Sequence, residues 1–484
     1  MSKVNQLANH AIPHEPADEL RRDLSNRHIQ LISIGGCIGT GLFMGSGRSI
    51  ASSGPSILLV YAIIGIMLYF VMRAIGELLL ADLRYKSFVD CAEDLLGPWA
   101  GFATGWSYWL AWIITAMAEL VAITGYMSFW WPDMPGWTTV PIAVAGLLSI
   151  NLLTVRLFGE VEFWFALIKI IAIVSLISVG CWMIATAFPA PSGYTASLSN
   201  LWRYGGIFPA GWEGILSGFQ TAIFAFVGME IIGTTAAEVK DPNVVMPRAI
   251  NAIPLRILLF YLGTLTTLMM VTPWSAISAE ESPFVGMFIL TGFKASASVV
   301  NFIAVSSALS SINSGIYSTS RMLYGLSKHG DASVAFSVLS SKGVPVLALL
   351  FIGLLLLLPA GLLVLDASMM DIFQGVAAAA SLLFLCVWSI LLLCYLSFRR
   401  RRPELHDRSL FPMPYGHFMS KVVLGFFAFI LVLLTLDADG RWMVALIPSW
   451  FGLLALVYFG WVRRQPGHKM RRGRHRVRTI RELG

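Results

Sequence analysis

The sequence GGCIGTGLFMGSG, Gly35 to Gly47, lies inside an apolar run that begins near Ile29, and six of its thirteen residues are glycine. Glycine at this density interrupts a helix, because it leaves the backbone unconstrained and adds no packing surface. In a lipid bilayer, an interrupted helix exposes peptide groups that lipid cannot satisfy. A polar partner must meet these groups, and in membrane transporters that partner is often the transported molecule.

The same glycines could instead serve to pack two helices closely together. Gly35 and Gly39 are four residues apart, as are Gly41 and Gly45. This spacing of small residues lets two membrane helices cross closely. The stretch alone leaves packing and ligand binding open.

The composition indicates an integral membrane protein. Of the 484 residues, 57% are hydrophobic and 13% are charged, whereas a soluble globular protein has roughly 25% charged residues. The first 27 residues are polar, so we expect no cleavable signal and expect the first membrane helix to direct insertion. The five cysteines form no CxxC pair and the eight histidines lie in termini or loops, so we expect free thiols and no histidine metal site in the membrane.

Twelve apolar stretches are long enough to cross the hydrocarbon, which takes about 20 apolar residues. The predicted fold class is therefore an all-α integral membrane protein with 12 transmembrane helices. The stretches cover approximately residues 28–48, 55–80, 97–127, 139–156, 161–187, 213–236, 248–272, 283–311, 344–364, 369–397, 418–436 and 441–462.

The distribution of basic residues predicts that both termini are cytoplasmic. With the N-terminus inside, most of the 34 Lys and Arg residues fall on the inner side, and only Arg48, Arg203, Lys294 and Arg441 fall outside. This distribution obeys the positive-inside rule. The membrane topology therefore accounts for the net charge of +7, and nucleic-acid binding is not needed to explain it. We expect the basic C-terminal tail to lie against anionic lipid.

A second interrupted helix is predicted in FAFVGMEIIGTTAAE, Phe224 to Glu238, which contains Gly228 and Gly233. The order Ile-Gly-Thr at residues 38–40 recurs at residues 232–234. Each interrupted helix opens a set of five spans, and the two sets have opposite orientations. This arrangement predicts an inverted repeat with a binding site between the two breaks.

The predicted division of the chain follows from this repeat. It comprises a cytoplasmic tail at 1–27, a first repeat at 28–187, an extracellular loop at 188–212, a second repeat at 213–397, two further helices with a preceding cytoplasmic loop at 398–462, and a basic tail at 463–484. The segment Tyr85 to Gly101 is expected to lie along the inner surface as a short amphipathic helix. The small polar run Ser306 to Ser320 could line a path or pack closely.

Four ionisable residues fall in or near the spans: Glu77, Glu119, Lys169 and Glu230. A buried charge needs a partner or a neutral state. Burial favours a neutral Lys169 that can release a proton, which suggests proton coupling; the alternative is a structural lysine bonded to free carbonyls of a broken helix. Glu119 is expected to be protonated or paired, Glu230 to belong to an intracellular gate or network, and Glu77 to be structural.

Several stretches resemble the amino acid permeases of the amino acid-polyamine-organocation superfamily, from about Leu20 to the last predicted span. They are NRHIQLISIGGCIGTGLFMGSG, YKSFVDCAEDLLGPWAG, GEVEFWFALIKIIAIVSL, FAFVGMEIIGTTAAEVKDP and NSGIYSTSRMLYGL. The resemblance implies a LeuT-like fold of five plus five inverted helices, with helices 1 and 6 broken, followed by two more helices.

The resemblance also implies roles for individual residues. Gly39, Thr40 and Gly41 would offer backbone amides to a substrate carboxylate, and Gly45 and Gly35 are left to packing. Carbonyls for the substrate ammonium would come from the unwound part of helix 6, namely Phe224, Ala225, Phe226 and Val227, with Gly228 permitting the break and Phe224 acting as an aromatic gate. Lys169 matches the helix 5 lysine of proton-driven relatives, and Glu119 and Glu230 match acids in helices 3 and 6.

These features predict a secondary transporter that imports small neutral amino acids, such as glycine and either hand of alanine or serine, together with a proton by alternating access. No nucleophile–base pair, metal spacing or phosphate loop is present, so we expect neither an enzyme nor a cofactor. The alternatives are a permease for aromatic or branched-chain amino acids and an exchanger without proton coupling. We expect a multi-pass protein of the bacterial inner membrane that needs no protein partner.

Overall fold

The computed structural model describes residues 38–85, 87–152, 155–191, 193–235, 241–279, 282–290, 294–364, 368–436 and 438–464. Within these ranges the chain is helical and contains no β-strand, apart from an isolated bridge between Pro189 and Thr195. The all-α prediction is therefore confirmed for this part of the chain.

Ten helical spans in the described residues are long and apolar enough to cross a membrane, and Gly136–Asn151 is a shorter apolar helix. One of the ten, Gly45–Ala81, contains a turn at Gly54, whose φ is 61°, followed by Pro55. It therefore includes the end of the first predicted span and the whole of the second. A multi-pass membrane protein is confirmed, while the number twelve and the inverted repeat stay predictions.

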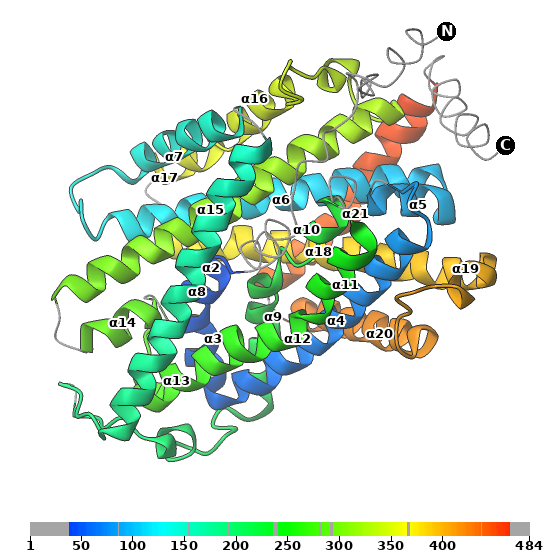
Figure 1. Ribbon diagram of the computed structural model, residues 1–484. Coiled ribbons are helices and arrows are strands. Elements are labelled where there is room, and N and C mark those ends of the chain that lie inside the picture. The colour runs from blue at the N-terminus through cyan, green and yellow to red at the C-terminus, as the bar shows by residue number, and fades with distance from the viewer. Residues whose placement is uncertain are drawn as a thin grey trace, which may run out of the picture.

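Seven α-helices are described between residues 40 and 185, and Figure 1 labels each of them. They are α2 (Thr40–Phe43), α3 (Gly45–Ser53), α4 (Ile57–Ala81), α5 (Phe88–Leu96), α6 (Pro98–Met127), α7 (Gly136–Asn151) and α8 (Val155–Ala185).

The remaining helices are mostly shorter, with α15 and α18 as the two long exceptions. They are α9 (Gly211–Ala222), α10 (Ile231–Thr235), α11 (Pro242–Asn251), α12 (Ile253–Arg256), α13 (Thr264–Val271), α14 (Pro283–Leu290), α15 (Lys294–His329), α16 (Val346–Leu355), α17 (Leu358–Val364), α18 (Met369–Arg401), α19 (Pro403–Asp407), α20 (Gly416–Leu436) and α21 (Ala438–Gly460). A π-helical segment, Ile257–Gly263, joins α12 to α13.

The predicted amphipathic helix is α5, which connects α4 to α6. Its first turn is closed by a capping box, in which the Ser87 hydroxyl accepts from the Val89 amide and the Asp90 carboxylate accepts from the Ser87 amide. Phe88, Cys91 and Leu95 form its buried face, so the helix packs on the bundle along one side.

One predicted span has different limits in the structure. The stretch 283–311 divides into α14 and α15, and α15 continues to His329. Within this helix the small polar side chains satisfy their hydroxyl groups by bonding back to its own backbone. For example, the Thr319 hydroxyl donates to the Gly315 carbonyl at 2.7 Å and the Ser320 hydroxyl to the Tyr317 carbonyl at 2.9 Å. The lower hydropathy of this run had hidden its helical length.

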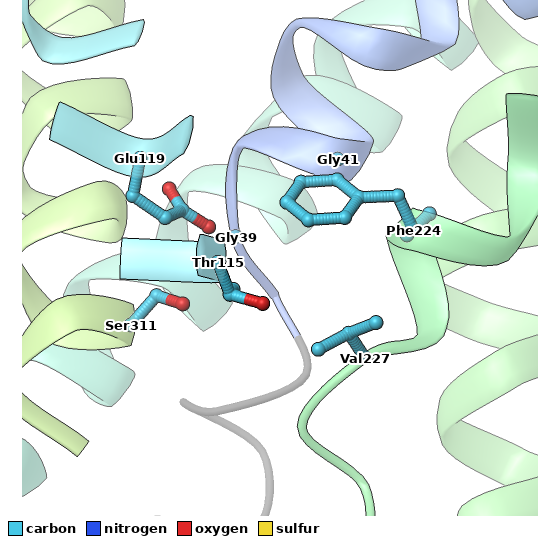
Figure 2. Close-up of a pocket in the computed structure, with 8 residues that line it drawn as sticks. Gly39, Gly41, Thr115, Glu119, Phe224, Val227 and Ser311 are labelled. Carbon is cyan, nitrogen blue, oxygen red and sulfur yellow. The ribbon is translucent and has the colours of Figure 1, made fainter. Parts of the chain in front are cut away.

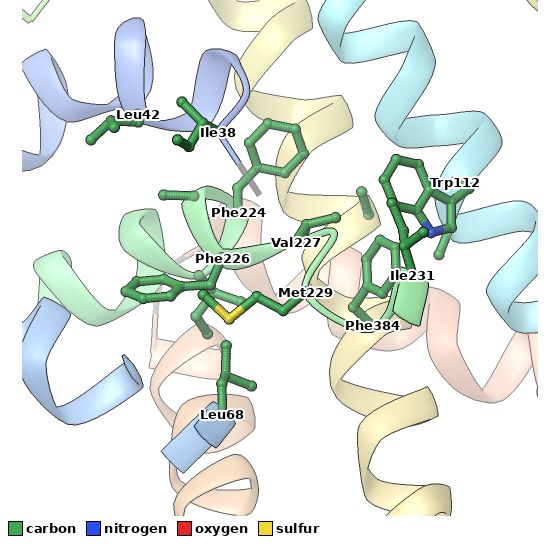
Figure 3. Close-up of a cluster of buried hydrophobic side chains, with 14 of the residues drawn as sticks. Ile38, Leu42, Leu68, Trp112, Phe224, Phe226, Val227, Met229, Ile231 and Phe384 are labelled. Carbon is green, nitrogen blue, oxygen red and sulfur yellow. The ribbon is translucent and has the colours of Figure 1, made fainter. Parts of the chain in front are cut away.

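Helix α6 packs against both α15 and α18, and the three helices run side by side through the centre of the molecule (Figure 1). Aromatic side chains fill the contact between α6 and α18, where the Trp112 and Phe384 rings meet edge to face at 5.9 Å. Figure 3 shows these two residues next to Ile231 on one side of the interrupted helix, with Phe226 on its other side. The central core thus supports the break at residues 223–230 from one side.

Candidate functional site

The first predicted break falls at the start of α2, and the residues before Ile38 lie outside the described part of the chain. Gly39 has an extended backbone, with φ −114° and ψ −163°, and the helix begins only at Thr40. The carbonyl of Ile38, which precedes this break, accepts a hydrogen bond from the Ser307 hydroxyl of α15 at 2.7 Å. The small polar run of α15 therefore contacts the break directly.

The second break separates α9 from α10. The chain leaves α9 at Ala222, makes a 3₁₀ turn at Ile223–Phe226, and becomes extended at Val227. Gly228 has a φ of 105°, a left-handed conformation that favours glycine. The predicted break at Gly228 is thus confirmed as backbone geometry.

The two breaks touch each other at Gly41 and Ala225. A Cβ atom built on Gly41 would lie 2.8 Å from the Cα of Ala225, closer than real Cβ atoms approach another atom. Only glycine lets the two backbones approach this closely. Among the described residues a Cβ on Gly45 meets nothing within 4 Å, so this part of the structure shows no close helix packing at Gly45; Gly35 and Cys37 lie outside the described residues.

A small cavity lies between the breaks, with about 210 Å³ of empty space including its opening. Figure 2 shows the Phe224 ring beside Gly41 on one side and Glu119 beside Gly39 on the other. The lining residues are Gly39, Gly41, Thr115, Glu119, Phe224, Ala225, Val227 and Ser311. The cavity therefore brings together five of the eight residues expected to bind substrate, and Thr40, Phe226 and Gly228 are not among its lining residues.

Two of the carbonyls expected to meet a substrate ammonium already accept hydrogen bonds within the protein. The Phe224 carbonyl accepts from the Val227 amide at 3.2 Å. The Ala225 carbonyl accepts from the Tyr261 hydroxyl at 2.7 Å. Tyr261 belongs to the π-helical segment and was not predicted, because nothing in its uniformly apolar run distinguishes it.

Glu119 of α6 is bonded to the first break. The Thr40 amide donates to both carboxylate oxygens of Glu119 at 3.3 Å, and a Cβ on Gly39 would lie 2.4 Å from Glu119 Oε1. The resemblance assigned this amide to a substrate carboxylate. In the structure a carboxylate of the protein itself occupies it.

Lys169 of α8 is completely buried, and its charge acts on the carboxylates of both Glu119 and Glu162. Glu162 is also completely buried, and it accepts from the Ser310 hydroxyl at 2.5 Å and from the Asn313 amide at 3.3 Å. Glu162 was missed in the sequence. Its position seven residues before Lys169 was the available signal, since that spacing places both side chains on one face of a helix.

Glu230 lies within the second break and does not line the cavity. It is completely buried, and its Oε2 accepts from the Gly228 amide at 3.3 Å. The indole groups of Trp112 and Trp388 lie near its carboxylate. Glu230 is thus separate from the pair of carboxylates around Lys169.

Glu77 holds together segments outside this site. It is completely buried in α4 and accepts from the Tyr395 hydroxyl at 2.9 Å and from the Met413 amide at 2.6 Å, and it pairs with His406. Arg73, one turn earlier, donates to Asn251 at 3.0 Å. These contacts fit the structural role expected for Glu77.

Comparison with known proteins gives a consistent assignment. The model of the amino acid permease family matches residues 28–469. A D-serine/D-alanine/glycine transporter of Escherichia coli (strain K12) is 53% identical over 95% of this chain and 97% of its own. Amino-acid permease AapA of Bacillus subtilis (strain 168) is 46% identical over 94% and 97%, and aromatic amino acid transport protein AroP of Salmonella typhimurium (strain SL1344) is 37% identical over 91% and 95%. The chain therefore belongs to the amino acid permease family of the amino acid-polyamine-organocation superfamily, and it is an amino acid transporter.

Proposed function

We propose that this transporter imports small neutral amino acids of the glycine, D-alanine and D-serine class together with a proton, by alternating access. The observation that carries the proposal is the cavity between the two breaks, because an amino acid zwitterion needs hydrogen-bond donors at one end and acceptors at the other. Backbone amides at the start of a helix suit a carboxylate, and unwound carbonyls suit an ammonium group.

The aromatic lining of the cavity favours a small side chain. Phe224 lines it, and the ring of Phe224 meets that of Phe373 of α18 edge to face at 5.8 Å. A bulky substrate would have to displace these two rings. The 53% identity with a D-serine/D-alanine/glycine transporter supports the same class, whereas the 37% identity with an aromatic amino acid transport protein keeps larger substrates as the second candidate.

Proton coupling is assigned to Lys169 and Glu119, with Glu230 as a network residue beside the second break. The burial of all three supports this assignment, because a charge in a span needs a partner or a neutral state. An exchanger without proton coupling is the alternative. If Lys169→Ala protein still concentrates glycine against a gradient with wild-type pH dependence, Lys169 has no coupling role.

The wider arrangement belongs to the same proposal. The chain would sit in the bacterial inner membrane with both termini in the cytoplasm, its basic tail against anionic lipid, and no cofactor, metal or obligatory protein partner. Residues 28–187 and 213–397 would form inverted repeats around the cavity, with two further helices after them. The separation of the two breaks along the sequence, near residues 39 and 228, supports this repeat.

The decisive experiment is uptake of labelled glycine into proteoliposomes with an imposed pH gradient and without sodium. A competition panel would contain the D and L forms of alanine, serine, leucine and phenylalanine. We expect alanine and serine to compete and phenylalanine not to compete. Strong competition by phenylalanine would support the second candidate, and accumulation that needs sodium would overturn the proposed energetics.

A further inference from the structure

We propose that Glu119 and the carboxylate of the substrate bind the same backbone amide, that of Thr40, and therefore exclude each other. This inference rests on the proposed function, in which the break at Gly39 receives the substrate carboxylate. It assigns Glu119 a specific action: substrate binding displaces its carboxylate, and the displaced carboxylate takes up the coupled proton.

The first step is the chemistry of the Thr40 amide. Thr40 is the first residue of α2, so its N–H has no acceptor in the preceding turn. Both carboxylate oxygens of Glu119 lie 3.3 Å from this nitrogen. The Thr40 amide thus already has a carboxylate of the protein as its acceptor.

The second step is space. Gly39 and Glu119 both line the cavity and lie next to each other (Figure 2). Even a single Cβ atom on Gly39 would come within 2.4 Å of Glu119 Oε1. A second carboxylate group is larger than one carbon atom. It cannot share the Thr40 amide with Glu119, so one of the two must leave.

The third step concerns the displaced carboxylate, which is 2% exposed in this position. The groups that face it are Lys169 from α8, Ser311 from α15 and Thr40 from α2, with Tyr126 on its own helix. Lys169 and Tyr126 are the titratable members of this set. A buried carboxylate that loses an N–H donor is costly as an anion, so one proton from the aqueous side adds to its oxygen for each substrate bound.

The competing explanation is that Glu119 is a fixed cap of α2 that never leaves Thr40. The two explanations differ in how the affinity for substrate depends on pH. Competition requires substrate to bind more tightly as pH falls, because protonation of Glu119 releases the amide. A fixed cap gives no such link between Glu119 and the pH dependence.

The test is equilibrium binding of labelled glycine to the purified full-length protein in detergent between pH 5.5 and 8.5. We expect the affinity of the wild type to fall with rising pH by up to about tenfold per pH unit. Glu119→Gln, which cannot ionise, should bind glycine with an affinity that does not change with pH. Glu213→Gln removes an exposed acid in α9 and should keep the wild-type slope.

A wild-type slope in the Glu119→Gln protein overturns the inference. If that variant elutes as an aggregate, Glu119→Asp replaces it: the shorter side chain keeps its charge but no longer reaches Thr40, so tighter binding at pH 8.5 is expected and unchanged binding overturns the inference. Failure of the wild type to bind glycine, alanine or serine at any pH would instead refute the proposed function.

Discussion

Tyr261 donates its hydroxyl hydrogen to the Ala225 carbonyl at 2.7 Å, and its ring lies parallel to that of Phe226, with 4.9 Å between centroids and 8° between planes. Tyr261 lies in the π-helical segment Ile257–Gly263. Such segments are frequent at functional sites. Tyr261 therefore contacts the second break twice, through the Ala225 carbonyl and through the Phe226 ring.

Removal of the Tyr261 hydroxyl should weaken substrate binding. In Tyr261→Phe the Ala225 carbonyl loses its donor while the ring contact remains, and an unmade buried hydrogen bond costs about 1–3 kcal/mol. We expect the KM for glycine to rise about tenfold with little change in protein yield. Transport kinetics in proteoliposomes measure this effect.

Tyr61→Phe is the matched control for Tyr261→Phe. The Tyr61 ring contacts both Tyr261 and Phe226, at 5.9 Å and 5.3 Å, but its hydroxyl lies near Ser49 and makes no hydrogen bond to the described residues of the second break. We expect its KM to stay within about twofold of the wild type. Equal effects of the two substitutions would mean that ring packing, and not the bond to Ala225, holds the break.

The close approach of the two breaks predicts contrasting effects at two glycines. In Gly41→Ala the new methyl group would lie 2.8 Å from the Cα of Ala225, so the backbones must separate, whereas in Gly45→Ala it meets none of the described residues within 4 Å. Overpacking of this kind costs about 1–3 kcal/mol. We expect at least a tenfold loss of glycine uptake for Gly41→Ala and wild-type uptake for Gly45→Ala, at matched amounts of protein in the membrane.

The sequence predicted the two places where the helices are interrupted, because glycine residues there determine the backbone conformation. Dense glycine in an apolar run indicated two broken helices with a site between them, and the resemblance to the permease superfamily named the residues that would face each other there, Gly39 and Gly41 with Phe224 and Ala225. Gly45 satisfied the same spacing rule and has open space around it among the described residues. Spacing along one helix does not determine which residues face a neighbour.

The missed contacts depend on how helices are rotated against one another. Ser311 lines the cavity and Ser310 bonds to Glu162, although they are adjacent members of one serine-rich run. The bond of Glu119 to Thr40 joins residues 79 apart in sequence. No period or motif specifies such a pairing, because it depends on the crossing of α6 with the broken helix.

Glu162 provides a further prediction about coupling. Glu162→Gln removes a buried negative charge near Lys169 and places an NH₂ group where the Asn313 amide now donates. The substitution leaves Glu119 as the carboxylate that still acts on Lys169, and weakening a buried network of charges is destabilising. We expect proton-driven glycine accumulation to fall more than tenfold, with a smaller effect on glycine exchange at equal pH on both sides.

Glu160→Gln is the control for this substitution, since Glu160 lies on the same helix and is only partly buried. It should retain both accumulation and exchange. The interpretation of Glu162 as a partner of Lys169 is contradicted if the two variants accumulate glycine equally well, or if Glu162→Gln loses exchange and accumulation to the same extent.

The contacts of Glu77 predict a loss of stability that is separate from transport. Glu77→Ala would leave the Tyr395 hydroxyl and the Met413 amide as buried donors without an acceptor and would remove the ion-pair partner of His406. Hydrogen bonds to a charged group contribute about 1.5–3 kcal/mol each, so a clear fall in the unfolding temperature of the detergent-solubilised protein is expected. Tryptophan fluorescence during heating measures it.

The proper comparison is Glu404→Ala, because Glu404 lies on α19 close to His406 but is exposed. It changes the same net charge without touching a buried donor, so its unfolding temperature should match that of the wild type. Glu77→Gln should fall between the two, since an amide oxygen can still accept one bond but carries no charge for His406. If all three variants unfold at the wild-type temperature, the segment from His406 to Met413 is held by other contacts, such as the stacking of Arg73 on Phe411, 3.6 Å from the ring centre.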